Sequence, residues 1–341
     1  MFKPEVFYLL LENVQVKLVN IGILGNASIA KKSIIPTLLS MPEKFSLKGI
    51  ASQSYLNQEF IFGKEIIDSY NSYSSLIKDE NIDAIYIPLP NSMHAEWIEK
   101  SLDHDLHVLV EKPLSTNLID VKRLNDIALH KNLVLMENFQ FRFHKQLSLL
   151  KDLLKKNEIG QLRCLKSSFG FPPLDDNGNI RYQRALGGGA LLDAGVYPLK
   201  ISSIFLKNDI SVSSSILNYD DKLGVDIWGG GHLVQNNGKL FSQISFGFDN
   251  FYQCSIELWG SAGKLSADRI FTAPAEEKQI INLENGSGRS KIEVPPDNQF
   301  LNMLNHFHKL IFSKNLRNSE YDQNVTQGKL IQEMIDKSNV S

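Results

Sequence analysis

Two side chains that can exchange protons follow a run of three glycines in the second half of the chain. In the segment "GGGALLDAGVYPLK", Gly187–Gly189 precede Asp193 and Tyr197. The carboxylate and the phenol are four positions apart, so on a helix they share one face. No strand pattern precedes the glycines, as a phosphate-binding loop would require. We therefore expect the glycines to allow a close backbone approach and to open a helix that carries both side chains into a cleft.

A lysine after an apolar run is the second chemically active position. The segment "HVLVEKP" reads as a buried strand that ends at Glu111 and Lys112. Pro113 then favours an extended or turn conformation at Lys112. Ligands of open parallel sheets bind at the carboxyl ends of the strands, so this ammonium can reach over a binding cleft. A solvated loop lysine paired with its neighbour is the alternative.

The elements that must position these groups begin with a glycine turn near the N-terminus. In "NIGILGNASIA" the turn joins a strand to a helix, which is a shortened form of the dinucleotide-binding fingerprint. One glycine permits the tight turn, and another lets the backbone approach a pyrophosphate at the helix N-terminus. The residues expected to contact a cofactor here are Gly22, Gly25, Asn26, Ala27, Ser28 and Ile29.

The end of the second expected strand bears on the choice between NAD and NADP. An NAD enzyme usually has an acid there for the ribose 2′-hydroxyl. This chain has "IASQS", with Ser52, Gln53 and Ser54. The missing carboxylate favours NADP, while the lack of an arginine for a 2′-phosphate leaves NAD open.

Strands and helices alternate over residues 17–143. Expected strands are "VKLVNIGILG", "FSLKGIAS", "IDAIYIPLP", "LHVLVEKP" and "LVLMENF", with helical patterns between them. This alternation predicts a doubly wound, Rossmann-type parallel sheet. We treat residues 1–16 as an N-terminal extension.

The pattern changes at residue 144. A helix ending at Gly160 is followed by strand-like segments without helices between the later ones, and two helical segments close the chain. This predicts an α+β domain over residues 144–341, with a large, mostly antiparallel, open-faced sheet for substrate binding and oligomerisation. The strand "KLFSQISFGF" suggests an apolar outer face, so we expect a homodimer or homotetramer formed through this sheet.

Composition excludes several classes of partner. The chain of 341 residues is 43% hydrophobic and 22% charged, with a net charge of −2, which gives no reason to expect nucleic acid or an anionic membrane. No apolar run approaches the roughly 20 residues of a membrane span. The N-terminus lacks the basic region and cleavage site of a signal peptide. Two cysteines without a CxxC spacing fit a reducing cytoplasm.

Several ordered motifs together resemble one enzyme family. They are "GILGNASIA", "IPLPNSMHAEW", "HVLVEKPLS", "ENFQFRFHKQ", "GGGALLDAGVYPLK" and "WGSAGKLSADRIFTAP". In this order they resemble the glucose–fructose oxidoreductase / inositol dehydrogenase (Gfo/Idh/MocA) family over nearly the whole chain beyond residue 16. The resemblance implies an NAD(P)-dependent oxidoreductase that transfers hydride between nicotinamide and a sugar alcohol or ketone carbon.

The resemblance also assigns catalytic residues. It implies that Lys112 hydrogen-bonds the substrate oxygen near the nicotinamide and that Asp193 belongs to the second motif. The family usually has a histidine four residues after that aspartate, where this chain has Tyr197. This is similar to the subgroup with glucose–fructose oxidoreductase, nucleotide-sugar 3-ketoreductases and dihydrodiol dehydrogenases, in which a tyrosine takes the acid/base place.

The chemistry of such a pair is coherent. Hydride transfer to a ketone creates an alkoxide that needs a proton. A tyrosine has an ordinary pKa of about 10. We expect Lys112 to lower the pKa of Tyr197 and to stabilise the oxyanion, with Tyr197 as general acid. The alternative for Tyr197 is a packed core tyrosine.

Further contacts are expected on the same grounds. The resemblance places "IPLPNSMH" beneath the cofactor, with Pro88, Leu89, Pro90, Asn91, His94, Glu111 and Lys112 as cofactor contacts. Residues expected to face substrate are Arg142, His144, Arg181, Tyr182 and Tyr197. Arginines suit a nucleotide-sugar pyrophosphate, although each also suits a surface salt bridge. His306 and His308 point to different sides of a helix, so we assign no metal site.

The sequence leaves three alternatives for the function, two of which differ in the substrate. The first is a keto group of a nucleotide-activated sugar. The second is a free sugar or a dihydrodiol. The third is a dinucleotide-binding sensor or regulator with the same fold, against which the presence of both Lys112 and Tyr197 argues.

Overall fold

The structure of the protein is a computed structural model that describes residues 17–52, 60–174, 178–207 and 209–340. Two expected cofactor contacts, Gln53 and Ser54, lie outside these residues.

The N-terminal half forms a seven-stranded sheet in the order β3-β4-β2-β1-β5-β6-β7. All neighbours are parallel except β3 and β4. The bounds are β1 Val19–Leu24, β2 Phe45–Ala51, β3 Phe60–Phe62, β4 Glu65–Tyr70, β5 Ala84–Ile87, β6 His107–Glu111 and β7 Leu135–Asn138. The Rossmann-type prediction is confirmed, and the β3–β4 pair is an addition that the sequence did not predict.

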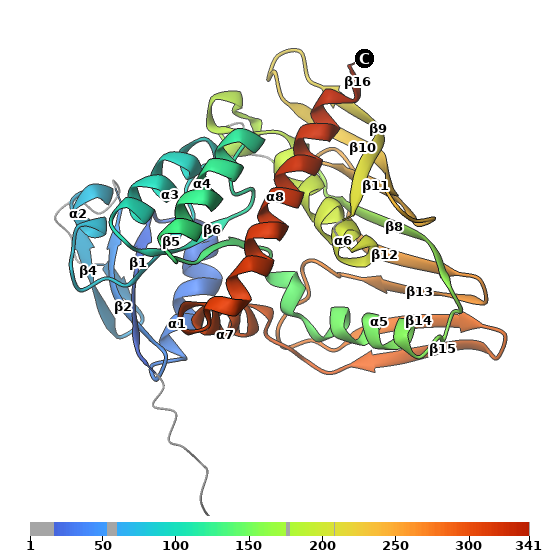
Figure 1. Cartoon of the computed structure of the whole chain (residues 1–341), viewed down its shortest axis with the longest axis horizontal. Coiled ribbons are helices and arrows are strands. Elements are labelled where there is room, and N and C mark those ends of the chain that lie inside the picture. Colours follow the sequence, from blue (N-terminus) through green and yellow to red (C-terminus); the bar gives the residue numbers. More distant parts are fainter. Residues whose placement is uncertain (1–16, 53–59, 175–177, 208, 341) are drawn as a thin grey trace, which may run out of the picture.

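Helices cover both faces of this sheet, as Figure 1 shows. They are α1 Ile35–Leu39, α2 Tyr73–Ile77, α3 His94–Asp103 and α4 Leu118–His130. The strands between them are apolar on both sides: Ile21 and Leu109 on one face and Ile85 and Val108 on the other have no exposed surface. Burial on both faces explains why these strands read as continuous apolar runs rather than as alternating patterns.

The C-terminal helices return to the first sheet. Helix α7, Gln299–Phe312, contributes Met303, Leu304 and Phe307 to the core around β1 and β2. Helix α8, Lys314–Asp336, packs on α4 and β7 as well as on the second sheet. The two helices were assigned by sequence to the region 144–341, but the apolar face of α7 completes the core of the N-terminal half, and α8 contributes Tyr321 to that half and Leu330, Ile331 and Met334 to the core of the second.

The second sheet has nine strands in the order β15-β14-β13-β12-β8-β11-β10-β9-β16. The bounds are β8 Leu162–Gly170, β9 Ile210–Tyr219, β10 Asp226–Gln235, β11 Phe241–Gly247, β12 Gln253–Gly260, β13 Gly263–Asp268, β14 Gln279–Asn285, β15 Gly288–Val294 and β16 Ser338–Val340. Pairing is antiparallel except for β11 with β8 and β16 with β9. The predicted, mostly antiparallel sheet is confirmed.

Within the described part of the chain, helices lie on one face of this sheet only (Figure 1). They are α5 Lys145–Lys155, α6 Val196–Leu206 and α8. In β11, the strand of "KLFSQISFGF", Ile244 and Phe246 point under the helices, whereas Phe241, Gln243 and Ser245 point outward, so this strand gives the outer face one apolar side chain. Further outward apolar side chains come from other strands, with Ile216, Trp228 and Trp259 about half exposed.

The segment Arg184–Leu206 is long and apolar enough to cross a membrane by length and composition alone. Its most apolar window is 83% buried inside the protein. It is the central core helix of the second domain, packed against β8 and β11.

Candidate active site

A cleft of about 560 Å³ opens between the two halves of the molecule. One wall comes from the loops after β1, β5 and β6, and the other from the segment before α6 and the end of β8. Predicted site residues that line it are Ala27, Ser28, Ile29, Pro88, Leu89, Asn91, Glu111, Lys112, Arg181, Asp193 and Tyr197. The volume is within the range of small-molecule sites.

The nucleotide side of the cleft is built by the turn after β1. Gly25 has φ +105°, a conformation that L side chains rarely adopt, and its N–H donates to the carbonyl of Ala51 at 2.8 Å. A helical segment begins at Ser28, and its first residues, Ser28 and Ile29, line the cleft, where the first N–H groups of a helix have no partner within the helix. The buried Oδ1 of Asn26 has no hydrogen-bond partner among the described residues. The glycine turn and the helix start fit the diphosphate of a dinucleotide, whereas the acceptor Asn26 Oδ1 requires a donor such as a hydroxyl group.

Substituting Gly25 should weaken dinucleotide binding selectively. Gly25→Ala strains the turn because φ is +105°, and its Cβ would lie 2.8 Å from Cδ2 of Leu89, whose side chain must move in the neighbouring cofactor loop. We expect the Kd for NADPH, measured by fluorescence titration, to rise about tenfold or more. Gly63→Ala is the control, because Gly63 also has positive φ but has open space around it. Equal NADPH affinity in the two variants would contradict this assignment.

Three charged side chains meet at the centre of the cleft. Lys112 Nζ donates to Oδ1 of Asp193 at 2.6 Å and to the Asp193 carbonyl at 2.8 Å. Arg181 Nε donates to the other carboxylate oxygen, Oδ2, at 2.6 Å. Burial alone would raise the pKa of Asp193, but the charges of Lys112 and Arg181 outweigh it and lower that pKa to about 2. Asp193 is therefore an ionised anchor that fixes both cations, not a proton carrier at neutral pH.

The helix that carries Asp193 starts with a wide turn. Residues Leu191–Gly195 form a π-helical turn that runs into α6, and Pro198 is in the first turn of α6. Proline has no N–H to give to the preceding turn. The carbonyl of Asp193 instead accepts from Lys112, which belongs to the other half of the molecule. An irregular helix start thus provides a backbone contact to the lysine.

The expected close backbone approach of the three glycines is made to other parts of the protein. A Cβ on Gly187 would lie 2.8 Å from Cβ of Asn91, and one on Gly188 would lie 2.5 Å from the carbonyl of Arg181. A Cβ on Gly189 would lie 2.3 Å from Oδ1 of Asp226. Asn91 Nδ2 donates to the Gly187 carbonyl at 2.8 Å, so the first contact joins the two halves.

Asp226 binds the start of this helix, and its raised pKa should make the stability of the protein depend on pH. Its Oδ2 accepts from the Leu191 N–H at 2.6 Å, and burial raises its pKa to about 6 despite that bond. Because the pKa is raised, the Asp226 carboxyl binds its proton more tightly in the folded protein than in the unfolded chain. Stability is therefore lost as pH rises between about 4 and about 6. Asp226→Asn removes this dependence. The free energy of unfolding of the wild type should fall by up to about 3 kcal/mol relative to the variant across that window, measured by urea unfolding. A constant difference would contradict the assignment.

Tyr197 lies in an aromatic pocket at the cleft wall. Its ring meets those of Phe139, Phe169 and Phe271 at centroid distances of 5.6, 5.1 and 5.4 Å. Lys112 Nζ lies 5.1 Å from the centre of the ring.

The expectation that Lys112 lowers the pKa of Tyr197 is wrong for this structure. Burial raises the pKa of Tyr197 well above its ordinary value, and the carboxylates of Glu111 and Asp193 raise it further. Asp193 takes up the charge of Lys112, so the ammonium does little for a phenolate. The phenol stays protonated at neutral pH, which is the form that a general acid requires.

Glu111 belongs to a buried polar group beneath the cleft. Its Oε1 accepts from the hydroxyl of Tyr86 at 2.6 Å and from Nδ2 of Asn138 at 2.7 Å. Burial raises the pKa of Glu111, and these two hydrogen bonds act in the opposite direction. The residue is held rigidly at the end of β6, beside Lys112.

His94 does not reach the cleft. It is fully buried, with Nδ1 2.7 Å from the carbonyl of Pro113 and Nε2 2.8 Å from the carbonyl of Leu89. The expected cofactor contact is therefore replaced by a link between two cofactor loops. The start of α3 is not capped by a side chain, because a 3-10 turn, Asn91–Met93, precedes the helix and the Asn91 side chain crosses to Gly187.

Three residues expected to face substrate lie elsewhere. Arg142 forms a bidentate ion pair with Glu320 of α8 at 2.7 and 2.9 Å, and both side chains are buried. His144 caps α5 by accepting from the N–H of Gln146. Tyr182 packs its ring on Phe248, and its hydroxyl accepts from the Leu174 N–H. Local sequence placed them near the domain crossover or the glycines, but their partners come from distant segments.

Sequence reasoning missed part of the cleft wall. The additional lining residues are Gln140, Phe169, Phe171, Gly178, Asn179, Ile180 and Phe300. Ile180 is 45% exposed at the rim, in a short 3-10 turn, Ile180–Tyr182. No motif marks these positions, because they come from four separate segments that only the fold brings together.

Comparison with known proteins accounts for both halves of this arrangement. Residues 19–139 match the family model described as the GFO_IDH_MocA oxidoreductase family with an NAD-binding Rossmann fold. Residues 147–266 match the GFO/IDH/MocA C-terminal domain. The chain belongs to the GFO/IDH/MocA oxidoreductase family.

Relatives of this GFO/IDH/MocA oxidoreductase include sugar reductases and diol dehydrogenases. The dTDP-3,4-didehydro-2,6-dideoxy-alpha-D-glucose 3-reductase of Saccharopolyspora spinosa is 39% identical over 283 residues, which is 83% of this chain and 84% of the relative. The trans-1,2-dihydrobenzene-1,2-diol dehydrogenase of Xenopus tropicalis is 27% identical over 248 residues, 68% of this chain and 74% of the relative.

A solved structure resembles this GFO/IDH/MocA oxidoreductase over almost its whole length. It is a 3-ketoreductase from Actinomadura kijaniata, KijD10, in complex with NADP and TDP-benzene. The TM-score is 0.89 at 31% identity, covering 94% of this chain and 98% of the other. The expected family, fold and NAD(P)-dependent enzyme class are confirmed.

Proposed function

We propose that this protein is an NADP-preferring reductase of a keto group on a nucleotide-activated sugar. The observation that carries the proposal is that Lys112, Asp193 and Tyr197 line the same cleft as the dinucleotide turn at Ala27–Ile29. Similarity to the dTDP-sugar 3-reductase of S. spinosa and to the NADP-bound 3-ketoreductase supports the substrate class and the cofactor.

The side chains have distinct roles in this proposal. Hydride delivery to the carbonyl carbon is the chemistry that a bound NADPH supplies. Lys112 has three N–H groups, and Asp193 takes two of them, which leaves a third for the substrate carbonyl oxygen. As negative charge develops on that oxygen, Lys112 stabilises it and Tyr197 donates the phenolic proton to it. The ketone becomes an alcohol, and the phenolate regains a proton from solvent.

Arg181 fits the nucleotide part of such a substrate. Asp193 accepts from its Nε, and Asn179 Oδ1 lies 3.4 Å from Nη1, so the guanidinium is fixed in place. Its side chain remains 38% exposed at the cleft wall. An anchored arginine with free N–H groups is suited to a diphosphate.

The direct test is NADPH oxidation followed at 340 nm. With dTDP-3,4-didehydro-2,6-dideoxy-α-D-glucose as probe we expect turnover, and slower turnover with NADH in place of NADPH. Similarity to a D-xylose 1-dehydrogenase (NADP(+)) of Haloferax volcanii, 32% identical over 75% of this chain, favours free sugars as the second candidate. Oxidation of D-xylose or a dihydrodiol, without reduction of the dTDP-sugar, would select that candidate. Tight NADPH binding without turnover of any of these substrates would point to a sensor.

Two accompanying proposals concern assembly and location. We propose a homodimer or homotetramer formed through the open face of the nine-stranded sheet, where Trp228 and Trp259 are 44% and 55% exposed. Light scattering that gives a monomer would contradict it. We also propose a cytoplasmic location, which is supported by two free, buried cysteines, Cys164 and Cys254.

A further inference from the structure

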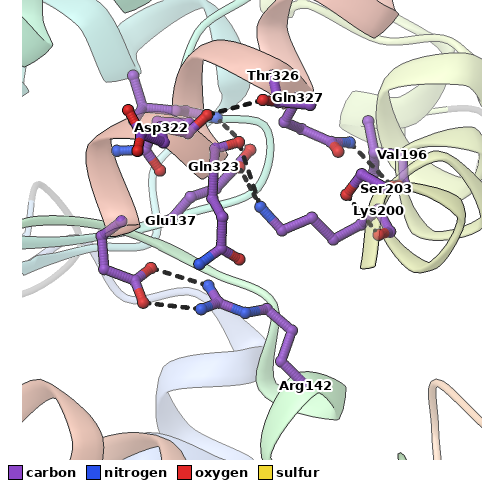
Figure 2. A network of polar contacts seen from close by, with 12 residues as sticks. Glu137, Arg142, Val196, Lys200, Ser203, Asp322, Gln323, Thr326 and Gln327 are labelled. Carbon is purple, nitrogen blue, oxygen red and sulfur yellow. Dashed lines mark hydrogen bonds and ion pairs between the residues drawn. The ribbon is translucent and has the colours of Figure 1, made fainter. Parts of the chain in front are cut away.

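A buried lysine and a buried glutamate lie directly behind the cleft. Lys200 of α6 and Glu137 of β7 expose 1% and 2% of their side chains, and Nζ lies 4.0 Å from Oε2. Neither residue lines the cleft. Figure 2 shows Lys200 extending from α6 toward Glu137 and the backbone of Gln323 in α8.

Glu137 is attached to the turn that carries Lys112. Its Oε1 accepts from the N–H of Leu114 at 2.9 Å, two residues beyond Lys112. Its Oε2 has no hydrogen-bond partner among the described residues, so Lys200 is the cation that faces it. A shift of this carboxylate would therefore pull on the lysine turn.

Lys200 lies close to Tyr197 in α6 and next to an aromatic ring that contacts Tyr197. It lies three residues after Tyr197 on α6, about one helical turn away. Its Nζ is 5.2 Å from the ring centre of Phe139, and that ring meets the ring of Tyr197 edge-on at 88°. The two ends of the pair thus reach the two halves of the active site.

Neither charge is stable there alone. Burial lowers the pKa of Lys200 and raises the pKa of Glu137, while each partner acts against the shift of the other. The neighbouring pair Arg142–Glu320 adds one charge of each sign, also shown in Figure 2 for Arg142. Removing one partner leaves an uncompensated buried charge, which is costly.

We propose that Lys200 and Glu137 are positioning residues that set the placement of Lys112 relative to Tyr197 from the buried side of the cleft. Asp193 joins the two halves at the cleft surface, and the Lys200–Glu137 pair joins them underneath. The inference rests on the proposed function for the roles of Lys112 and Tyr197. A small misplacement of reacting groups is sufficient to cost a large factor in rate.

The test separates positioning from stability with two variants. Lys200→Met leaves Glu137 unpaired, so both the melting temperature and kcat should fall, kcat by about tenfold or more. In the double variant Glu137→Gln/Lys200→Met the amide still accepts from Leu114 and no charge is left unpaired. We expect the melting temperature to recover while kcat remains low, because the attraction between the halves is gone. Affinities for NADPH and for TDP should stay within about twofold of wild type in both variants.

The control is Arg317→Met. Arg317 is a comparably buried cation of α8, bound to the backbone carbonyls of Asn132, Leu310 and Ile311. It should lower the melting temperature and leave kcat unchanged. The proposal is overturned if Lys200→Met leaves kcat unchanged, or if kcat recovers with stability in the double variant.

A second readout does not depend on turnover. Amide hydrogen exchange with NADPH bound should become faster in residues 111–117 when Lys200 is replaced, although Lys200 is on another element. Unchanged exchange in that segment would overturn the pairing even in an active enzyme. Faster exchange in a protein that reduces no sugar would retain the pairing and reject the proposed function.

Discussion

Replacing Tyr197 with phenylalanine should lower kcat for ketone reduction by about 10²-fold or more, because general acid catalysis contributes that much to proton transfer. The ring contacts with Phe139, Phe169 and Phe271 remain in the variant, so the fold should be retained. NADPH affinity should be nearly unchanged. Because the pKa of Tyr197 is raised, the wild-type phenol is protonated throughout the neutral range, and the ratio of the two rates should be constant there.

The measurement is steady-state NADPH oxidation at 340 nm with a separate NADPH titration by fluorescence. Tyr182→Phe is a matched control, since Tyr182 is a nearby tyrosine whose hydroxyl accepts from Leu174 and does not line the cleft. It should keep the wild-type kcat. Unchanged turnover in Tyr197→Phe would reject the general-acid role.

Lys112→Met should lower kcat by about 10²- to 10³-fold, since it removes the donor for the developing oxyanion. It also removes one of the two cations bound to Asp193. The remaining ion pair with Arg181 at 2.6 Å keeps Asp193 compensated, so we expect a folded protein with a moderate loss of stability. The pKa of Asp193 should rise from about 2, because one of the charges that lower it is gone.

Kinetics at saturating NADPH and thermal unfolding check both parts of this prediction. Lys100→Met is the control, because Lys100 forms an exposed i,i+4 pair with Glu96 and should affect neither quantity by much. A variant at Lys112 that keeps kcat but binds NADPH more weakly would make this lysine a cofactor ligand instead of an oxyanion donor.

Much of the fold could be predicted because its signals are local. The alternation of apolar runs and helical patterns up to residue 143 gave the parallel sheet and its strands β1, β2, β5, β6 and β7. The strands β3 and β4 and the helix α2 were missed because they are short and only partly buried. The packing of α7 on the first sheet could not be read from sequence, since its apolar face suits either domain.

The candidate site also contains residues that local sequence predicts and residues that it does not. Lys112 and Tyr197 are in motifs with fixed spacing, and both line the cleft. Arg142 was misplaced because its ion-pair partner, Glu320, is 178 residues away, and no nearby sequence indicates that partner. The protonation of Tyr197 was misjudged for a related reason. Asp193 shares the helix face, and its carboxylate takes up the charge of Lys112.

The rim turn at Ile180–Tyr182 has a consequence for the engineering of this enzyme. Lys112 follows β6 and Tyr197 lies in the first turn of α6, whereas Ile180 stands at the cleft mouth on a separate short turn. The range of substrates that the enzyme accepts can therefore be changed by varying Ile180 and Phe171, while the residues of proton transfer stay the same. Arg181, in the same turn as Ile180, should not be varied with them. Its bond to Asp193 makes it a shared part of selectivity and catalysis, so a change there alters both.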